Sequence, residues 1–210
     1  MKTLEDRIHA ARLLCENLAA YKNSNAVIVA VAHGGVPVGF HIADILHLPL
    51  EVIPCKKIVH PFLAHKTIGS VCLNGTALER DYTIPQYYVN SQISMAKHSL
   101  QNQYKFYTNN RMPIRLKGRI VILVDDQLST GDTILACLKS IQKEEPEKII
   151  IAAPVTTLKA RNRVIQEVEH LTYLLVIDHT DTAQEYFTRV KDEEVKYLLS
   201  RAVEGYNQAA

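Results

Sequence analysis

The sequence predicts a doubly wound α/β fold built on a mainly parallel sheet. Short aliphatic runs alternate with amphipathic helical patterns, which is typical of βαβ units whose strands are covered on both faces. The chain has 210 residues, of which 47% are hydrophobic and 22% charged, and this suits one domain with a single core. The alternation stops over residues 56–117. We therefore expect one domain over residues 1–210, with 56–117 as an inserted hood or lid.

Each element is predicted from its pattern of apolar residues. Runs of aliphatic residues predict strands at about 26–32, 50–55, 118–124, 148–155 and 172–178. Apolar residues at helical spacing predict helices at about 4–22, 36–47, 91–107, 131–144, 159–169 and 192–201. The excursion at 56–117 holds three prolines, several weak strand patterns and one polar helix, as a lid or small subdomain would.

Charge and cysteine content narrow the class of protein. The formal net charge is only +2 and no basic run occurs, so we expect no nucleic-acid partner. The four cysteines form no C-x-x-C pair and mostly lie in apolar contexts, which favours reduced, buried thiols. Glu5 and Asp6 stand where a signal peptide would be basic, and no apolar stretch reaches the roughly 20 residues of a membrane span. A cytoplasmic protein without membrane contact is expected.

Residues suited to binding phosphate and metal follow the predicted strands. Ligands of open parallel sheets bind beyond the carboxyl ends of the strands. The segments there are His33-Gly34-Gly35, Lys56-Lys57, Asp125-Asp126 and Asp178. We therefore expect three kinds of group to meet at one edge of the sheet: backbone amides that can bind an anion, positively charged side chains and carboxylates.

The stretch VILVDDQLSTGDT, residues 121–133, predicts the centre of that site. Side chains alternate along a strand, so one of Asp125 and Asp126 would meet a ligand directly and the other would act through a cation or water. Two carboxylates this close repel each other, which favours Mg²⁺ or sugar hydroxyls between them. The alternative is that both acids only cap the following turn.

A phosphate-sized cup is expected directly after the two acids, where the chain enters a helix. Gly131 allows a tight turn, and the first amides of the helix face outward beside hydroxyl groups. Asp132 would repel a phosphate, so its side chain is expected to point away or to bond first-turn amides. The cup comprises Ser129, Thr130, Gly131, Asp132 and Thr133. Ser129 or Thr130 could equally be an ordinary N-cap.

A second cup is predicted in VAHGGVPVGF, after the first strand. Gly34 and Gly35 let backbone amides turn toward an anion, and Pro37 stands at a helix start. One Gly-Gly pair is weak evidence, but its place one strand-helix unit before the carboxylates favours a ligand with phosphates at both ends.

These motifs resemble those of a known family. VILVDDQLSTGDT resembles the 5-phosphoribosyl 1-pyrophosphate (PRPP) motif of type I phosphoribosyltransferases, in which four apolar residues precede two acids and a T-G-x-T turn. Further stretches, from DRIHAARLLCENLAAY through AHGGVPVGFHIADILHLPLEVIPCKKI, IGSVCLNG and AAPV to DEEVKYLL, are similar to a bacterial group whose acceptor base is unassigned. The resemblance covers about residues 4–200.

The resemblance implies a role for each motif. Asp125 and Asp126 would hold the ribose hydroxyls and help seat Mg²⁺, and Ser129 to Thr133 would hold the 5-phosphate. Ala32 to Gly35 would hold the pyrophosphate, with Ala32-His33 as the cis peptide that this loop often contains in the family. Lys56 or Lys57 would add positive charge there, or would be only a solvated strand end.

The chain departs from the family pattern at two places. The pyrophosphate loop usually reads R-G-G, whereas His33 stands in place of the arginine; arginine is always charged, but histidine is mostly neutral at pH 7. His65 stands where an acid is expected, with His60 nearby. His33, His60 and His65 could suggest a metal cluster, but their spacing matches no common zinc signature.

The expected function is transfer of a phosphoribosyl group from PRPP to a nitrogenous small-molecule acceptor, with Mg²⁺ as cofactor. The alternative is a PRPP-binding sensor without turnover. A P-loop hydrolase would need G-x-x-x-x-G-K-[ST], which is absent, and a haloacid-dehalogenase-type phosphatase would need differently spaced acids. The acceptor stays unassigned and a homodimer stays open. Aromatic residues that could stack on a base are Tyr82, Tyr87, Tyr88, Phe106, Tyr107, Tyr186 and Phe187.

Overall fold

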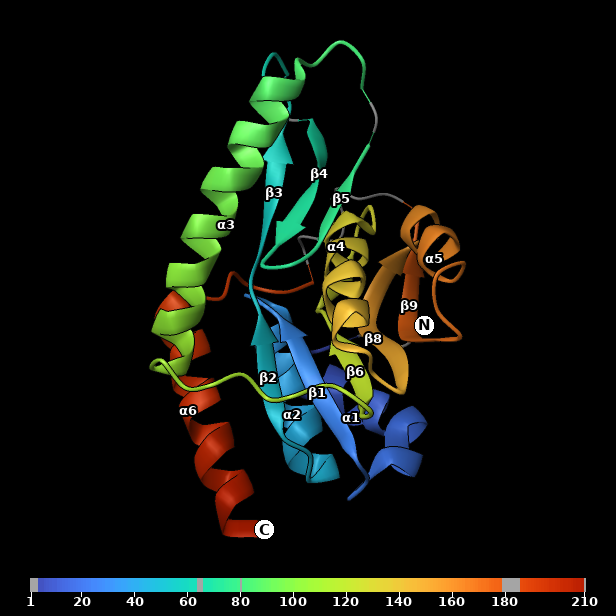
Figure 1. The fold of residues 1–210 in the computed structure, drawn as a ribbon. Helices are drawn as coiled ribbons and strands as arrows, with labels where there is room; N and C mark the ends of the chain where they lie inside the picture. Colours follow the sequence, from blue (N-terminus) through green and yellow to red (C-terminus); the bar gives the residue numbers. More distant parts are fainter. Residues whose placement is uncertain (1–3, 64–65, 80, 179–185, 210) are drawn as a thin grey trace.

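The computed structural model describes residues 4–63, 66–79, 81–178 and 186–209, which form an α/β fold with two sheets (Figure 1). All pairs in the main sheet are parallel, with β1 and β6 adjacent at its middle and β9 at one edge beside β8. Its strands are β1 (Ala26–Val31), β2 (Leu50–Ile53), β6 (Ile120–Val124), β7 (Gln127–Leu128), β8 (Lys148–Thr157) and β9 (His170–Ile177). The predicted fold class is confirmed.

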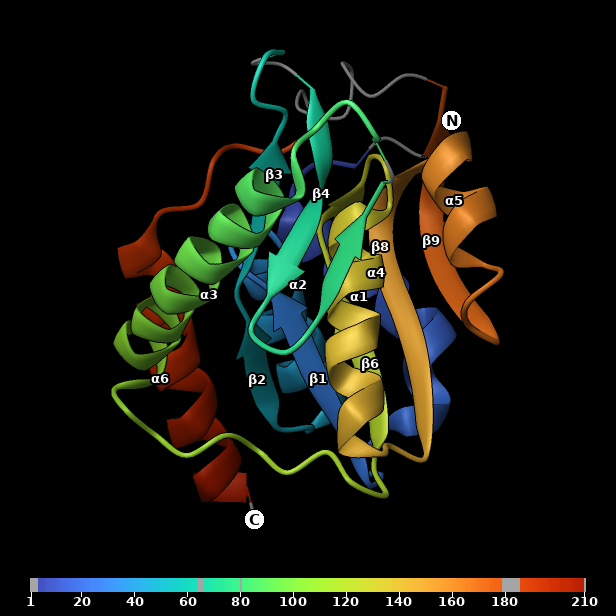
Figure 2. The same ribbon diagram turned by 45° about the horizontal axis from the view of Figure 1, so that its top comes forward.

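Helices cover both faces of this sheet because its strands are apolar on both sides. In β1, Val27, Val29 and Val31 belong to one buried cluster, and the alternate residues Ala26, Ile28 and Ala30 belong to the other. On the side of the alanines lie α1 (Arg7–Leu18), α2 (Gly35–Leu46) and α6 (Asp192–Ala209), and on the other side α4 (Asp132–Ile141) and α5 (Leu158–Val164) (Figures 1 and 2). The short 3-10 helices η1 (Ala19–Tyr21) and η2 (Gln142–Glu144) extend α1 and α4.

A small antiparallel sheet and a long helix span residues 55–108, which overlap most of the excursion expected at 56–117, and we call residues 55–108 the hood. The sheet has the order β3-β4-β5, and these strands span Cys55–Val59, Thr67–Cys72 and Thr76–Leu78. Helix α3 (Gln86–Thr108) packs on it through a separate apolar cluster. Figure 1 shows the hood beyond the carboxyl ends of β1 and β2. No helix in the described ranges is both long and apolar enough to span a membrane.

The prediction of one strand over 50–55 was wrong at its carboxyl end. Leu50–Ile53 pair with β1, whereas Cys55 begins β3 in the other sheet. Pro54 lies between them, and a proline has no N–H with which to continue a ladder. Lys56 and Lys57 are therefore part of a hood strand and not the loose end of a core strand.

Candidate functional site

A hollow of about 210 Å³ lies at the carboxyl edge of the main sheet, where β1 and β6 are neighbours. The chain leaves β1 toward α2 on one face and leaves β6 toward α4 on the other, so the two loops diverge and leave a crevice. The hollow is lined by Val31, Ala32, His33, Gly34, Cys55, Lys57, Asp125, Asp126, Gln127, Leu128, Ser129, Thr130, Gly131, Thr133 and Ile134. The structure thus brings both predicted cups and both acids to one place.

Three of the sequence-predicted site residues lie outside this lining. Gly35 begins α2, where a Cβ would come within 2.6 Å of the Val124 carbonyl oxygen. Lys56 is exposed and neighbours Lys57 on a strand, so the two side chains face opposite ways. Asp132 points elsewhere, because its carboxylate accepts hydrogen bonds from Arg163 at 2.5 Å and from the Thr130 hydroxyl at 2.7 Å.

The loop at 129–133 is held in place by neighbouring strands. Gly131 has a φ of 84°, which lets the chain turn sharply into α4. The Thr157 hydroxyl donates to the Ser129 carbonyl oxygen at 2.6 Å, and the hydroxyls of Thr133 and Ser70 lie 3.3 Å apart. Ser129, Thr130 and Thr133 thereby border the hollow together with the positive end of the α4 dipole, a setting that suits a phosphate group.

Asp125 and Asp126 have different surroundings, as alternation along a strand requires. The Asp125 carboxylate is buried and accepts the backbone N–H of Asp126 at 2.9 Å. Burial, and then the negative charge of Asp126, raise the pKa of Asp125 well above its usual value. The Asp126 carboxylate turns toward the loop after β1, where a Cβ on Gly34 would lie 2.0 Å from its Oδ2. Only glycine fits at position 34 beside this carboxylate.

Arg7 is a site residue that sequence reasoning did not assign. Its Nη2 and Nε donate to Asp126 Oδ2 at 2.6 and 3.2 Å, and both side chains are only 13% exposed, so solvent screens the pair weakly. The guanidinium also lies over the Phe187 ring, 4.8 Å from its centroid. The only sequence signal was that Arg7 falls within the stretch DRIHAARLLCENLAAY, which carries part of the family resemblance.

His33 is engaged by residues of α3 and α6. The Ala32–His33 peptide is cis. The His33 ring Nε2 lies 2.8 Å from Asp192 Oδ1 and 3.1 Å from the Tyr107 hydroxyl, which also donates to Asp192. The Gln103 Nε2 donates a hydrogen bond to the Tyr107 hydroxyl oxygen at 2.7 Å, so Gln103 belongs to the same hydrogen-bonded group. Hydrogen bonds from Tyr107, and then from His33, lower the pKa of Asp192.

Of the three histidines considered for metal binding, the two that the structure describes, His33 and His60, are not part of a group of metal-ligating side chains. His60 is buried in the hood with Nε2 3.6 Å from Asp81, and His65 lies outside the described residues. Within the described ranges, the group of three or more metal-ligating side chains that does form contains only cysteines, Cys55, Cys72 and Cys137.

The aromatic residues considered for base stacking are dispersed. Tyr82 and Tyr87 are 90% and 78% exposed on the hood, and Tyr107 is buried beside His33. Phe187 contacts the site through Arg7. Tyr88 donates its hydroxyl to the Val59 carbonyl within the hood, and Phe106 packs under Lys196. Of these residues, Tyr107 and Phe187 have contacts that connect them to the surroundings of the hollow, through His33 and Arg7 respectively.

Comparison with known proteins agrees with this arrangement. The model of the phosphoribosyl transferase domain family matches residues 2–186. The chain is 28% identical over 217 residues to a Mycobacterium tuberculosis protein described as a phosphoribosyl transferase with unassigned function; the match covers 100% of this chain and 49% of that protein. The chain thus spans about half the length of the curated relatives it matches.

Solved structures share the fold. The crystal structure of TT1426 from Thermus thermophilus superposes with a TM-score of 0.79 at 27% identity, over 95% of this chain and 99% of that one. A purine phosphoribosyltransferase from Pyrococcus horikoshii gives a TM-score of 0.51 at 19% identity, over 82% and 84% of the two chains, and this likeness is one of fold alone. With its motifs gathered at one sheet edge and the family model matched over residues 2–186, the chain belongs to the phosphoribosyl transferase domain family.

Proposed function

We propose that the chain transfers a phosphoribosyl group from PRPP to a nitrogenous small-molecule acceptor, with Mg²⁺-assisted release of pyrophosphate. The supporting observation is the single hollow bordered by the loop after β1, the acids after β6 and the start of α4. Its three parts suit pyrophosphate, ribose hydroxyls and a 5-phosphate respectively. The proposed phosphate ligands are Ser129, Thr130, Gly131 and Thr133, and the proposed pyrophosphate ligands are Ala32, His33, Gly34 and Lys57.

The carboxylates suit a magnesium ion. Burial, and then the charge of Asp126, raise the pKa of Asp125, and the positive charge of Lys57 offsets this only in part, so a divalent cation would stabilise the anionic form further. Asp125 would hold the ion directly or through water and ribose hydroxyls, with Asp126 beside it. When bound, Mg²⁺ would neutralise charge that develops on the departing pyrophosphate.

The other contribution of the protein to catalysis would be to position the donor. As the bond from ribose C1 to pyrophosphate breaks, C1 becomes oxocarbenium-like, and a nucleophilic nitrogen attacks from the other face. The loop at 129–133 is held by hydrogen bonds to β8 and β4, so its amides would stabilise a phosphate group with little rearrangement. Arg7 holds Asp126 against Gly34, which keeps the ribose-binding acid and the pyrophosphate loop in register. The hood would restrict water, which would otherwise hydrolyse the donor.

The test is release of pyrophosphate on mixing the protein with PRPP, Mg²⁺ and a panel of nitrogenous bases. We expect release with at least one acceptor, and none above background from the Asp125→Asn/Asp126→Asn variant. An Asp44→Asn variant is the matched control, because Asp44 is an exposed acid on α2 outside the hollow. Wild-type protein that neither binds PRPP nor releases pyrophosphate would contradict the proposal.

A second candidate function is a PRPP sensor that binds the donor without turnover. The observation that favours it is the pairing of His33 with Asp192, which places an imidazole tied to a carboxylate where the family usually has arginine. PRPP binding without pyrophosphate release under every acceptor condition would support the sensor over the transferase.

A further inference from the structure

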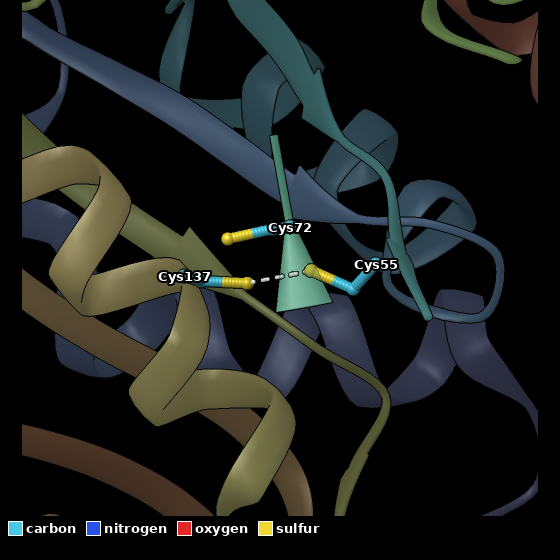
Figure 3. Close-up of side chains that lie close together, drawn as sticks. All are labelled: Cys55, Cys72 and Cys137. Atoms are coloured by element: carbon cyan, nitrogen blue, oxygen red, sulfur yellow. Dashed lines mark hydrogen bonds between the residues drawn. The ribbon is translucent and has the colours of Figure 1, made fainter. Parts of the chain in front are cut away.

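Three of the four cysteines meet beneath the candidate site. Their sulfur atoms all lie within 4.8 Å of one another, and those of Cys55 and Cys137 are 3.2 Å apart (Figure 3). They come from three elements: Cys55 opens β3, Cys72 closes β4 and Cys137 lies on α4. Cys55 and Cys72 are cross-strand partners in the hood sheet, so their convergence is fixed by the strand register.

The fold brings the hood unusually close to α4 at this point. A Cβ on Gly75 would lie 2.0 Å from the Ala136 carbonyl oxygen and 3.0 Å from the Cys72 sulfur. The absence of a side chain there lets the turn between β4 and β5 press against α4. Cys72 then donates to the Ala136 carbonyl at 2.9 Å, one residue before Cys137.

Ordinary core packing does not require this geometry. A buried thiol commonly packs as a small apolar group, and Cys15 does so in the other core cluster, among aliphatic residues. Figure 3 shows instead that the side chains of Cys55 and Cys137 point toward each other, while that of Cys72 lies beside them and points toward α4, with all three sulfurs within 4.8 Å of one another. Such convergence of soft ligands from separate elements is what a metal ion selects.

We propose that Cys55, Cys72 and Cys137 form a three-thiolate site for a soft metal ion of the Zn²⁺ class. A metal–sulfur distance of about 2.3 Å places bound sulfurs roughly 3.8 to 4 Å apart. The Cys55 and Cys137 sulfurs, 3.2 Å apart, would have to move apart to reach this spacing, and no sulfur–sulfur separation in the cluster exceeds 4.8 Å. A water molecule would be the fourth ligand, since Cys55 also lines the hollow and gives the ion an entry path.

Charge balance predicts how binding depends on pH. Zn²⁺ binds thiolates, so its uptake displaces thiol protons, and a complex of one Zn²⁺ with three thiolates carries one net negative charge, with Lys57 two residues beyond Cys55 on the same strand. Burial, reinforced by the neighbouring thiols, raises the pKa of Cys137 well above its usual value. The metal must displace these protons, so affinity should rise with pH.

The direct test titrates the reduced, oxygen-free full chain with Cd²⁺, whose thiolate complexes absorb in the ultraviolet. We expect one ion per chain, a sulfur-to-cadmium absorption band and protection of three of the four thiols from alkylation. Cys55→Ala should weaken Cd²⁺ binding by at least about 100-fold, more than the loss of an outer-sphere partner causes. Cys15→Ala is the matched control, because it removes a buried cysteine outside the cluster and should leave binding unchanged.

A second measurement compares each protein with and without Zn²⁺, so a loss of stability caused by the substitution itself does not affect the result. Zn²⁺ should raise the melting temperature of the wild-type protein, because it links the hood to α4, and it should not raise that of Cys55→Ala. The proposal is overturned if the folded, reduced wild type binds no Cd²⁺, or if Cys55→Ala binds it as tightly. A Cys55–Cys137 disulfide in protein that takes up no metal after reduction would likewise overturn it, in favour of a thiol pair.

Discussion

At position 34, hydrogen is the only side chain that the structure accommodates. The Asp126 carboxylate fills the space that a Cβ would occupy, and its hydrogen bonds with Arg7 oppose a movement away from that space. The Gly34-Gly35 pair, which the sequence suggested as a turn, therefore also lets the two loops of the site pack against each other. The glycine pair was predictable from its place after a strand, but Arg7 was not, because its partner lies 119 residues away.

Gly34→Ala should destabilise the protein by about 1–3 kcal/mol, the usual cost of forcing atoms into a filled space. It should also weaken PRPP binding, because Asp126 has to move. Denaturant unfolding and calorimetry provide the two measurements. Gly205→Ala is the control, since nothing lies within 4 Å of a Cβ there and alanine favours the helix. Equal stability of the two variants would refute the packing argument.

His33→Arg should tighten pyrophosphate binding above pH 7, because a guanidinium is always charged and can donate two parallel hydrogen bonds to one phosphate group. Asp192 lies 2.8 Å from the His33 ring and would compete for the new charge. The double variant His33→Arg/Asp192→Asn should therefore gain more affinity than the single one. Calorimetry with pyrophosphate and Mg²⁺ at pH 8 measures both gains, and unchanged affinity in both variants would exclude His33 from that end of the ligand.

At the scale of elements, the first turn of α6 joins α3 to the loop after β1. Asp192 accepts hydrogen bonds from Tyr107 and Gln103 of α3 and contacts His33. The helix itself was predictable from apolar spacing, although it extends to Ala209 and not only to 201. Its contact with the site was not predictable, since local sequence says nothing about which distant element a helix will meet.

The pairing of Asp192 should appear in the pH dependence of stability. Its pKa is lowered in the folded protein, so its contribution is present above the unfolded pKa of about 3.9 and is lost as pH falls through the folded value. Asp192→Asn should lower the melting temperature by about 1–3 °C at pH 7, a small effect for a half-exposed group.

The melting temperatures of wild type and Asp192→Asn should begin to converge below about pH 4, where the carboxylate of the unfolded state becomes protonated, and should meet only below the lowered pKa of the folded protein. Glu194→Gln is the control, an exposed acid on the same turn of α6. If the difference in melting temperature between wild type and Asp192→Asn stayed constant from pH 7 to pH 3, the charge of the carboxylate would contribute nothing to stability.

The strands of the two sheets differ in how far sequence predicts them. β1, β6 and β8 are continuous aliphatic runs buried on both faces, and this pattern identified them. β3 carries Lys56 and Lys57, both exposed, and β5 has only three residues, so their patterns were too short or too polar to assign. The cluster of Cys55, Cys72 and Cys137 could not be predicted for a related reason. These residues are far apart in the sequence and come together only when the hood packs on α4.

At the scale of the whole molecule, the site exists because the winding of the sheet reverses between β1 and β6. Chains leaving these neighbouring strands pass to opposite faces, and the hood stands over the gap that results. The order of aliphatic strands, glycine loop and acids was enough to predict this edge. The hood's contribution, Lys57 and Cys55, depends on a second sheet that the sequence left unassigned.

PRPP binding measured by calorimetry tests the central claim most directly. We expect Mg²⁺-dependent binding by the wild type and by the Asp44→Asn control, and no detectable binding by a folded Asp125→Asn/Asp126→Asn variant, because the loss of both carboxylates removes the ribose and cation ligands. Unchanged affinity in that double variant would contradict the account.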